Sequence, residues 1–410
     1  MQNQNWRFLS KVIAVAAVTV LVVSFSTLAM AQRGDAYHAM FVSAPREATN
    51  IPGVSIIADR PKGFNPLTAS SEELGRYGLP QRPDQQADAK RYARWKMAMQ
   101  ALRYRPAAHL EAKPYSSTNL MLAKKQPSAA AATRGAPATS NSYNWSGVAN
   151  TNGLLAWDSN HSFNNVFSVW NVPAAQPPSG ACTADPPITG GGGGVSGFFE
   201  VSWNGIDGVS SDTSVLQGGS LSYAICGATA ATYEGWVEWY PSYNILVIWC
   251  GPGPQIGETV TPCPVSAGDD FLVNTFGAAG TADQSVFVED TTQGWGATFV
   301  LSYIKGPGLV GSSEEWVVER PCTTSPCDTG ADYAALANYQ LDFFELTTGS
   351  DGAGDTFYAG AQESTTLYTM YDDGDDQIIS SIEQGSGGYQ GLQSVAFFSS
   401  NCTTSGGCTP

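Results

Sequence analysis

Positively charged side chains are scarce in this 410-residue sequence, and the scarcity is confined to one part of it. From Asn141 to Pro410 there are 28 Asp and Glu residues but only two bases, Lys305 and Arg320, a net charge of 2 − 28 = −26. Residues 32–140 are the opposite, with 16 Lys and Arg against 8 Asp and Glu, a net of 16 − 8 = +8. Such asymmetry predicts a basic partner for the acidic part, and the basic segment of the same chain is the natural candidate.

Histidine is also scarce, which weakens the case for several kinds of catalysis. Only His161 lies in the acidic part, in a polar stretch where a surface histidine is the simpler interpretation. A Ser-His-Asp hydrolase needs an imidazole base, so that class is poorly supported. Asp328-Thr329-Gly330 has no second copy, which an aspartic peptidase would need. The acidic run from Tyr371 to Asp376 misses the spacing of a calcium-binding loop and is better interpreted as a solvated turn.

The cysteines all lie in the acidic part, and an even number in an exported chain predicts disulfides. Their positions are Cys182, Cys226, Cys250, Cys263, Cys322, Cys327, Cys402 and Cys408. We expect the close pairs Cys322/Cys327 and Cys402/Cys408 to close small loops, and Cys250/Cys263 to close a hairpin. The full connectivity stays open. Because bridged cysteines are not nucleophiles and no Cys-x-x-Cys spacing occurs, we expect no thiol catalysis, no metal and no cofactor.

The first 31 residues predict a cleaved export signal. Arg7 and Lys11 precede an apolar stretch from Val12 to about Val23, and Ala29-Met30-Ala31 fits the small-x-small rule for a cleavage site. A membrane anchor is the alternative, but the apolar stretch is short for a spanning helix, which needs about 20 residues. We therefore expect a secreted product, extracellular or periplasmic, that has no membrane association after cleavage.

Residues 32–140 predict a basic propeptide with two helices. The stretch Ser70–Leu74 has the polar start and early acids of a helix N-terminus, and Tyr77–Pro80 would end that helix. A second helix is expected from about Pro83 to Tyr104. Residues Pro127 to Thr139 have the composition of a linker, where processing would release residues 141–410. A retained N-terminal helical domain is the alternative.

From Asn141 onward, short β-prone runs recur between Gly, Asn, Asp and Pro residues. They include Phe163–Val172, Trp236–Trp239, Asn244–Trp249, Phe271–Phe276, Ser285–Glu289, Ala297–Tyr303, Tyr339–Leu346 and Gln393–Phe398. Many short strands without helical stripes between them predict an all-β antiparallel sandwich or barrel. Residues Asp290–Gly294 have the composition of a hairpin turn. About 270 residues are enough for one large two-sheet domain.

Carboxylate chemistry is the kind of catalysis that this composition favours. An unperturbed glutamate titrates near pH ~4.3, so a carboxylate general base suits an acidic medium. At low pH most carboxyls of residues 141–410 become neutral, and a domain with two permanent cations then repels itself little. At neutral pH the same domain carries a net charge of −26.

Three segments occur in a recognisable order: Trp203–Gly208 with Val215–Gly218 after it, Tyr233–Pro241, and Glu315–Glu319. Together they resemble the glutamic peptidases, or eqolisins, which are acid endopeptidases. Asn144–Gly147 and Phe163–Pro173 look like the first strands of that family, and Tyr77–Pro80 looks like a stretch of its propeptides. The resemblance implies two packed antiparallel sheets in a jelly-roll, concanavalin A-like sandwich, with the active site on the concave face.

The resemblance also implies the catalytic residues. It places the catalytic glutamine at Gln217 and the catalytic glutamate at Glu319. Glu315 lies four residues earlier, on the same face of a strand, so spacing alone does not separate the two glutamates; the family pattern selects Glu319. The glutamate would take a proton from water and pass it to the leaving amine, while Gln217 would hold the water and donate to the oxyanion.

Other residues match positions that line or brace the cleft of the family, although the tryptophans would suit a sandwich core equally well. They are Trp145, Trp203, Asp207, Trp236, Glu238 and Tyr240. This sequence departs from the pattern at Asn204, where the family is usually apolar, and in a Gly-rich insertion before Trp203. These departures bear on substrate preference more than on catalysis.

The resemblance and the charge pattern together predict the partners. They are protein or peptide substrates and the chain's own propeptide, which would inhibit at neutral pH and leave as carboxylates protonate. We expect a monomer that binds no nucleic acid. The main alternative function is a carbohydrate-binding or glycoside-hydrolysing jelly roll, because one fold hosts both. A non-catalytic acidic surface protein is the third interpretation.

Overall fold

The structure is a computed structural model of the chain, and it describes a large part of residues 44–409. The described ranges are 44–57, 60–86, 89–102, 110–114, 138–151, 162–183, 197–209, 214–251, 261–322, 333–339, 341–351, 356–358, 365–371, 378–384, 391–396, 401–402 and 408–409. Several features singled out in the sequence lie outside them. These are the export signal, most of the linker at 127–139, His161, Asp328-Thr329-Gly330, and most of the acidic run at 371–376.

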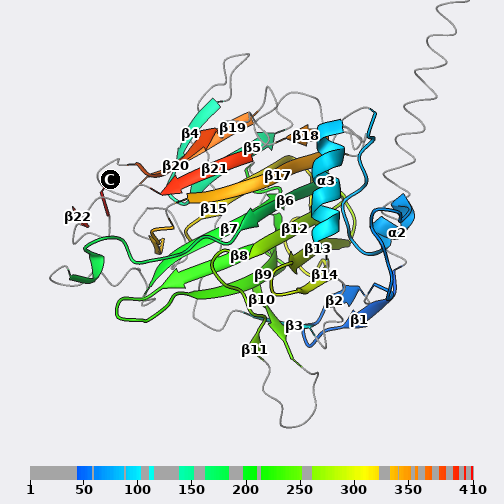
Figure 1. The fold of residues 1–410 in the computed structure, drawn as a ribbon, viewed down its shortest axis with the longest axis horizontal. Coiled ribbons are helices and arrows are strands. Elements are labelled where there is room, and N and C mark those ends of the chain that lie inside the picture. Colours follow the sequence, from blue (N-terminus) through cyan, green and yellow to red (C-terminus); the bar gives the residue numbers. More distant parts are fainter. Residues whose placement is uncertain are drawn as a thin grey trace, which may run out of the picture.

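Strands dominate the described residues, and they form two packed layers joined at one edge (Figure 1). Layer A runs in the pairing order β4, β19, β5, β15, β7, β8, β9, β10, with β11 and β3 both pairing with β10 and β16 pairing with β7. Layer B runs β20, β21, β17, β6, β12, β13, β14, β2, β1, with β18 beside β17. The pairing of β19 with β20 connects the two layers. The expected antiparallel β-sandwich is therefore confirmed.

The bounds of the elements are as follows. Layer A contains β3 (Leu110–Pro114), β4 (Ala138–Ser142), β5 (Trp145–Thr151), β7 (Phe198–Ile206), β8 (Val215–Ala224), β9 (Thr232–Tyr240), β10 (Tyr243–Cys250), β11 (Thr261–Pro262), β15 (Ser313–Glu319), β16 (Ala335–Leu336) and β19 (Thr365–Tyr371). Layer B contains β1 (Arg46–Ala48), β2 (Val54–Ile57), β6 (Phe163–Asn171), β12 (Asp270–Phe276), β13 (Asp283–Asp290), β14 (Trp295–Ser302), β17 (Leu341–Asp351), β18 (Thr356–Tyr358), β20 (Ile378–Gln384) and β21 (Gly391–Ala396). Outside the layers are α2 (Ser71–Arg76), α3 (Ala89–Ala101), the short helix Ala181–Thr183, and the pair β22 (Asn401–Cys402) and β23 (Cys408–Thr409).

The main core lies between the two layers. It joins Ile206, Leu216 and Trp316 of layer A to Trp170 and Phe271 of layer B, among other buried side chains. Because successive side chains of a strand point to opposite faces, the residues next to these point away from the core. In β8, Leu216 therefore faces the core while Gln217 faces the outer side of layer A.

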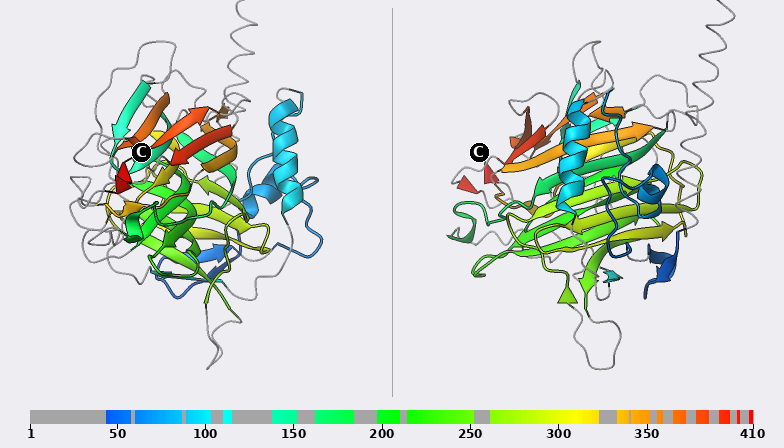
Figure 2. Two further views of the ribbon diagram at one scale, coloured as in Figure 1. Left: turned by 60° about the vertical axis from the view of Figure 1, so that its left-hand side comes forward. Right: turned by 45° about the vertical axis from the view of Figure 1, so that its right-hand side comes forward.

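Both outer faces are covered as well. A second apolar cluster on the outer face of layer A includes Trp145, Trp203 and Trp236. On the outer face of layer B, α3 lies across β17, β6, β12 and β13, and Figure 2 shows it standing on that side of the sandwich. Both helices lie where the sequence predicted helices, and Ser70 caps α2 in a capping box with Glu73. That this segment is a propeptide remains a prediction.

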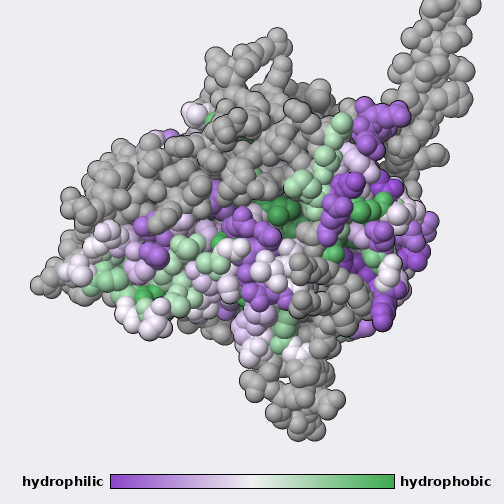
Figure 3. All heavy atoms as spheres, viewed as in Figure 1, coloured by the Kyte–Doolittle hydropathy of each residue, from purple (hydrophilic) through white to green (hydrophobic). Residues whose placement is uncertain are grey.

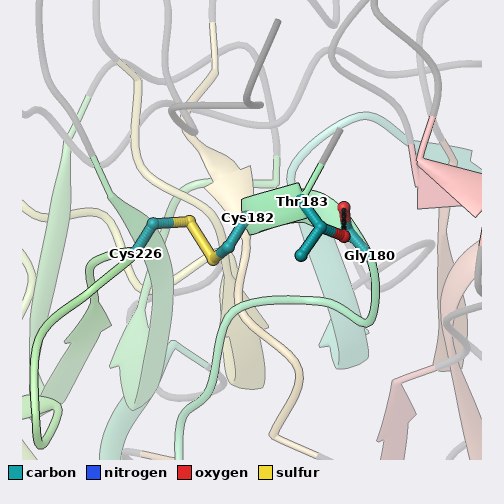
Figure 4. The surroundings of a disulfide bond; sticks show 4 residues. All are labelled: Gly180, Cys182, Thr183 and Cys226. Atoms are coloured by element: carbon teal, nitrogen blue, oxygen red, sulfur yellow. Dashed lines mark hydrogen bonds between the residues drawn. A yellow bond between two sulfur atoms is a disulfide. The ribbon is translucent and has the colours of Figure 1, made fainter. Parts of the chain in front are cut away.

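Two disulfides are formed between described residues. Cys250 bonds Cys263, as predicted, and Cys182 of the short helix bonds Cys226 just after β8 (Figure 4). The β22–β23 register sets Cys402 opposite Cys408, consistent with the predicted small loop. Cys322 is also disulfide-bonded, while Cys327 lies outside the described residues. Asp290–Gly294 forms the predicted turn between β13 and β14. No helix among the described residues has the length and hydrophobicity needed to span a membrane.

Candidate active site

The residues singled out in the sequence gather on the outer face of layer A. Gln217 lies on β8, Trp236, Glu238 and Tyr240 on β9, and Trp203 on β7. Glu319 is the last residue of β15, Trp145 is the first of β5, and Asp207 directly follows β7. The strand alternation puts the β8 and β9 residues on one face, because their neighbours Leu216, Val237 and Trp239 belong to the inner core.

One row across layer A brings the polar residues of three strands together. Glu315 on β15 is paired with Gly205 on β7, Gly205 with Gln217 on β8, and Gln217 with Glu238 on β9. Paired residues point to the same face, and adjacent strands lie about 4.8 Å apart. The backbones of Glu315 and Gln217 are therefore about 10 Å apart, and only a residue without a side chain lies between them.

Gly205 has no side chain, and the ring of Trp203 packs over it. A Cβ atom at this position would lie 2.9 Å from both the Leu216 carbonyl oxygen and Trp203 Cζ3, and 3.1 Å from the Gln217 Cβ. Real Cβ atoms rarely come that close to backbone, so glycine is the residue that fits. Glu315 and Gln217 therefore lie on the same face of layer A on either side of Gly205, with the ring of Trp203 packed between them over this glycine.

Glu238 fixes the orientation of the Gln217 amide. Gln217 Nε2 donates a hydrogen bond of 2.5 Å to Glu238 Oε2. Both side chains are buried, and burial raises the pKa of Glu238 to about 8. Gln217 Oε1 has no hydrogen-bond partner among the described residues. With one N–H bound to Glu238, the second N–H and the carbonyl oxygen of Gln217 are left for a ligand.

Glu315 is a buried carboxyl with unused oxygens. Neither its Oε1 nor its Oε2 has a hydrogen-bond partner at good geometry within the described part of the chain. Burial raises the pKa of Glu315 well above its ordinary value; the Ser313 side chain opposes the rise, and the nearby carboxyls of Asp207 and Glu314 add to it. A buried unsatisfied carboxyl with a perturbed pKa costs stability, and functional sites are where such groups are found.

Glu319 has a different environment. Its Oε1 accepts a hydrogen bond of 2.9 Å from Asn144 Nδ2, and its Oε2 accepts one of 3.0 Å from Trp203 Nε1. Glu319 is paired with Trp145 and Val201, four residues along β15 from Glu315, which is about 13 Å. Trp145 packs edge-to-face on Trp203. Both carboxylate oxygens of Glu319 thus hold side chains in place.

Asp207 connects the end of β7 to the segment that precedes β15. Its Oδ2 accepts from the backbone N–H of Val310 and Gly311, at 2.6 and 3.1 Å. Its Oδ1 accepts from both the backbone N–H and the hydroxyl of Ser312, at 2.6 and 2.8 Å. Burial raises the pKa of Asp207, and these donors oppose the rise. Because Ser312 is three residues before Glu315, Asp207 fixes where β15 begins.

The remaining predicted residues line the same face. Trp236 on β9 is fully buried beside this row, paired with Gly219 of β8, and its indole N–H has no partner among the described residues. Tyr240 ends β9 and is partly exposed, and a cis peptide bond joins it to Pro241. Gly205 was not predicted as a site residue from the sequence. Its place between the strands that carry Glu315 and Gln217 follows only from the strand pairing.

Comparisons with known proteins bear on the family of the chain. The family model described as the Peptidase A4 family matches residues 143–388. Scytalidopepsin B from Scytalidium lignicola is 25% identical over 176 residues, 42% of this chain and 58% of that protein. Aspergillopepsin-2 from Aspergillus niger is 28% identical over 155 residues, 37% of this chain and 47% of that protein. The matches thus span about half the length of these two relatives.

A solved structure also aligns with the chain. It is the crystal structure of scytalido-glutamic peptidase with a peptide-based transition state analog, at a TM-score of 0.44 and 17% identity, covering 62% of this chain and 98% of the other. The assignment itself rests on the family model, which matches more than half of the 410 residues and contains the whole Glu315–Gly205–Gln217–Glu238 row. This chain belongs to the Peptidase A4 family.

Proposed function

We propose that the chain is the precursor of a secreted acid endopeptidase in which Gln217 and a glutamate of β15 hydrolyse peptide bonds. The family assignment supports the peptidase class. The observation that carries the proposal is the row in which a buried carboxyl and a buried amide lie on one face of layer A, two strands apart and separated by Gly205. Export rests on the sequence of the first 31 residues alone.

The geometry favours Glu315 as the general base. It lies two strands from Gln217 across one glycine, and its oxygens form no hydrogen bond of good geometry with the described residues, although the Ser313 side chain lies close enough to lower its pKa. Glu319, which the family resemblance selects, remains the competing assignment for the same role. Its two oxygens bind Asn144 and Trp203, so it would have to release one of them to act on a water.

The proposed reaction follows from the donors and acceptors present. The ionised glutamate takes a proton from a water that Gln217 Oε1 also holds, and this water attacks the scissile carbonyl. The second N–H of Gln217 Nε2 donates to the oxygen that becomes negative, because the first N–H is bound to Glu238. The protonated glutamate then gives its proton to the leaving amine nitrogen.

The burial of the site supports a latent precursor, or zymogen. Gln217 has 1% of its surface exposed, and Glu238 and Glu315 have none, so a peptide substrate cannot reach them in the full-length chain. The raised pKa of Glu315 keeps its carboxyl protonated under acidic conditions while it is buried. Opening the site would let water hydrate this carboxyl and bring its pKa back toward the ordinary value of ~4.3.

Casein hydrolysis at pH 3, after incubation of the purified chain in acid, tests the proposal. Gln217→Ala is expected to reduce turnover by about 10²–10³-fold, the cost of losing an oxyanion donor. Gln176→Ala is a matched control because Gln176 is exposed and lies outside the row. Full activity of the Gln217→Ala variant would refute the assigned role. Polysaccharide hydrolysis without casein hydrolysis would favour the carbohydrate-active alternative.

A further inference from the structure

The N-terminal segment contacts the sandwich in places that differ from those expected of a cleft inhibitor. Its helices cover the outer face of layer B, whereas Gln217 lies on the outer face of layer A. Leu74 and Leu79 of this segment join Phe167, Leu272 and Phe287 of the sheet in one buried apolar cluster. We propose that residues 44–114 are a permanent cover of the sandwich, which stays bound after the chain is cut in its linker.

Apolar contacts dominate the centre of this interface. Trp95 and Met99 of α3 are 4% and 1% exposed, so both are packed as tightly as core residues. The indole N–H of Trp95 donates to the Pro80 carbonyl at 3.0 Å, which ties α3 to the Tyr77–Pro80 stretch. Figure 3 shows hydrophilic and hydrophobic residues side by side over the region of α2 and α3, where Met97 is 62% exposed. Apolar contacts of this kind do not depend on pH.

The Tyr77–Pro80 stretch also binds the sheet through its backbone. Asn274 Nδ2 of β12 donates to the Gly78 carbonyl at 2.9 Å, and Thr298 Oγ1 of β14 donates to the Tyr77 carbonyl at 2.6 Å. Gly78 has φ = 68°, and a Cβ atom there would lie 2.5 Å from Thr298 Cγ2. This stretch is therefore shaped to fit layer B.

The same segment covers the exposed edges of both layers. Strand β2 pairs with β14, the last strand of layer B in the domain proper, over Val54–Ile56. Strand β3 pairs with β10 of layer A over Leu246–Cys250. Unpaired sheet edges and exposed apolar faces promote aggregation. Loss of residues 44–114 would uncover two edges and one apolar face at once.

Ion pairs lie at the periphery of this interface, and they are not what keeps residues 44–114 bound to the sandwich. Arg46 Nη1 lies 2.7 Å from Asp283 Oδ2, and Arg60 Nη2 lies 3.1 Å from Glu289 Oε2. These two ion pairs account for some of the attraction predicted from the +8 and −26 segments. They weaken when carboxyls protonate in acid, whereas the packing of Trp95, Met99 and Leu74 remains.

The test cuts the folded chain and asks whether the two parts separate. A recognition sequence for a specific protease is placed between residues 129 and 137, and an affinity tag marks the N-terminal part. After cutting, size-exclusion chromatography is run at pH 7, at pH 3, and at pH 7 with 1 M NaCl. Co-elution of both parts under all three conditions is expected. Separation at pH 3 or in high salt would overturn the proposal, because an electrostatic inhibitor would leave under those conditions.

A matched pair of variants tests which face of α3 keeps residues 44–114 bound to the sandwich. Met99→Asp places a charge in the buried cluster and is expected to weaken association after cutting at pH 7 by at least about 100-fold. Met97→Asp makes the same change two residues away, where the side chain is 62% exposed, and is expected to leave association unchanged. Equal retention of both variants would overturn the proposal. Both variants are compared by binding at pH 7, so this readout does not depend on the proposed acid peptidase activity.

Discussion

Replacing Glu200 with glutamine is expected to reduce the loss of stability of this protein as the pH rises from acid to neutral. Glu200 lies on the inner face of β7 and is fully buried. The Ser202 hydroxyl bonds Glu200 Oε1 and also lies 2.5 Å from Asp342 Oδ2. One hydroxyl proton cannot serve two carboxylates, so at least one carboxyl of this pair carries a proton of its own.

Burial and the nearby Asp342 carboxyl raise the pKa of Glu200 from 4.5 to about 8. A carboxyl whose pKa is higher in the folded than in the unfolded state stabilises the fold fully below the unfolded value. That stability is lost as the pH rises toward the folded value. Between pH 4.5 and pH 7.5, at about 1.4 kcal/mol per pH unit, the loss from this one group is at most about 4 kcal/mol.

Urea unfolding at pH 4 and pH 7.5 measures this effect. Glutamine cannot ionise, so Glu200→Gln should lose at least about 2 kcal/mol less than the unchanged chain over this interval. Glu47→Gln is the control, because Glu47 is exposed. If the unfolding free energies of Glu200→Gln and the unchanged chain fall in parallel with pH, the protonated buried pair is not a source of acid-dependent stability.

Three further predictions concern the candidate site, the turn that positions β15, and the two disulfides. Glu238→Gln is expected to keep near-normal kcat at pH 3, because glutamine mimics the protonated acid that binds Gln217. Glu238→Ala should lower kcat about tenfold or more, and steady-state kinetics measure both variants. Asp207→Ala removes four hydrogen bonds and should lower the free energy of unfolding by about 2–4 kcal/mol. It should also lower the rate of casein hydrolysis. Unchanged unfolding in urea would contradict the role of Asp207 in holding the start of β15. Replacing Cys182 and Cys226 with alanine opens a loop with a sequence separation of 44 and should cost about 4 kcal/mol in thermal unfolding, against about 3 kcal/mol for Cys250 and Cys263 with a separation of 13.

Local patterns in the sequence were enough to predict many of the strands. Strands such as Phe271–Phe276 and the turn at Asp290–Gly294 follow from β-propensity and turn chemistry, which are properties of neighbouring residues. The Cys250–Cys263 bridge closes a short loop and was predictable for the same reason, whereas Cys182–Cys226 depends on how distant segments meet.

The choice between Glu315 and Glu319 could not be made from spacing. Both glutamates have the same strand parity, so both point to the outer face of layer A. What separates them is the register between β15, β7 and β8, which sets Glu315 opposite Gly205 and Gln217. Register depends on tertiary packing, and one sequence does not reveal it.

The docking of the basic segment was likewise beyond the sequence. Its charge predicted attraction to the acidic part, and the pairs Arg46–Asp283 and Arg60–Glu289 show such contacts. Charge does not say which face is bound. The apolar side of α3 and the strand β2 determine that, through Met99 and the β14 edge.

The most direct test of the central claim compares Glu315→Gln with Glu319→Gln in casein hydrolysis at pH 3, after acid incubation. Glu315→Gln is expected to lower kcat by about 10²–10⁴-fold, the usual contribution of a general base. Glu319→Gln is expected to lower kcat less than about tenfold and to destabilise the fold by about 1–3 kcal/mol, because its bonds to Asn144 and Trp203 are disturbed. Near-normal hydrolysis by Glu315→Gln, together with loss of activity in Glu319→Gln, would contradict the assignment of the base to Glu315.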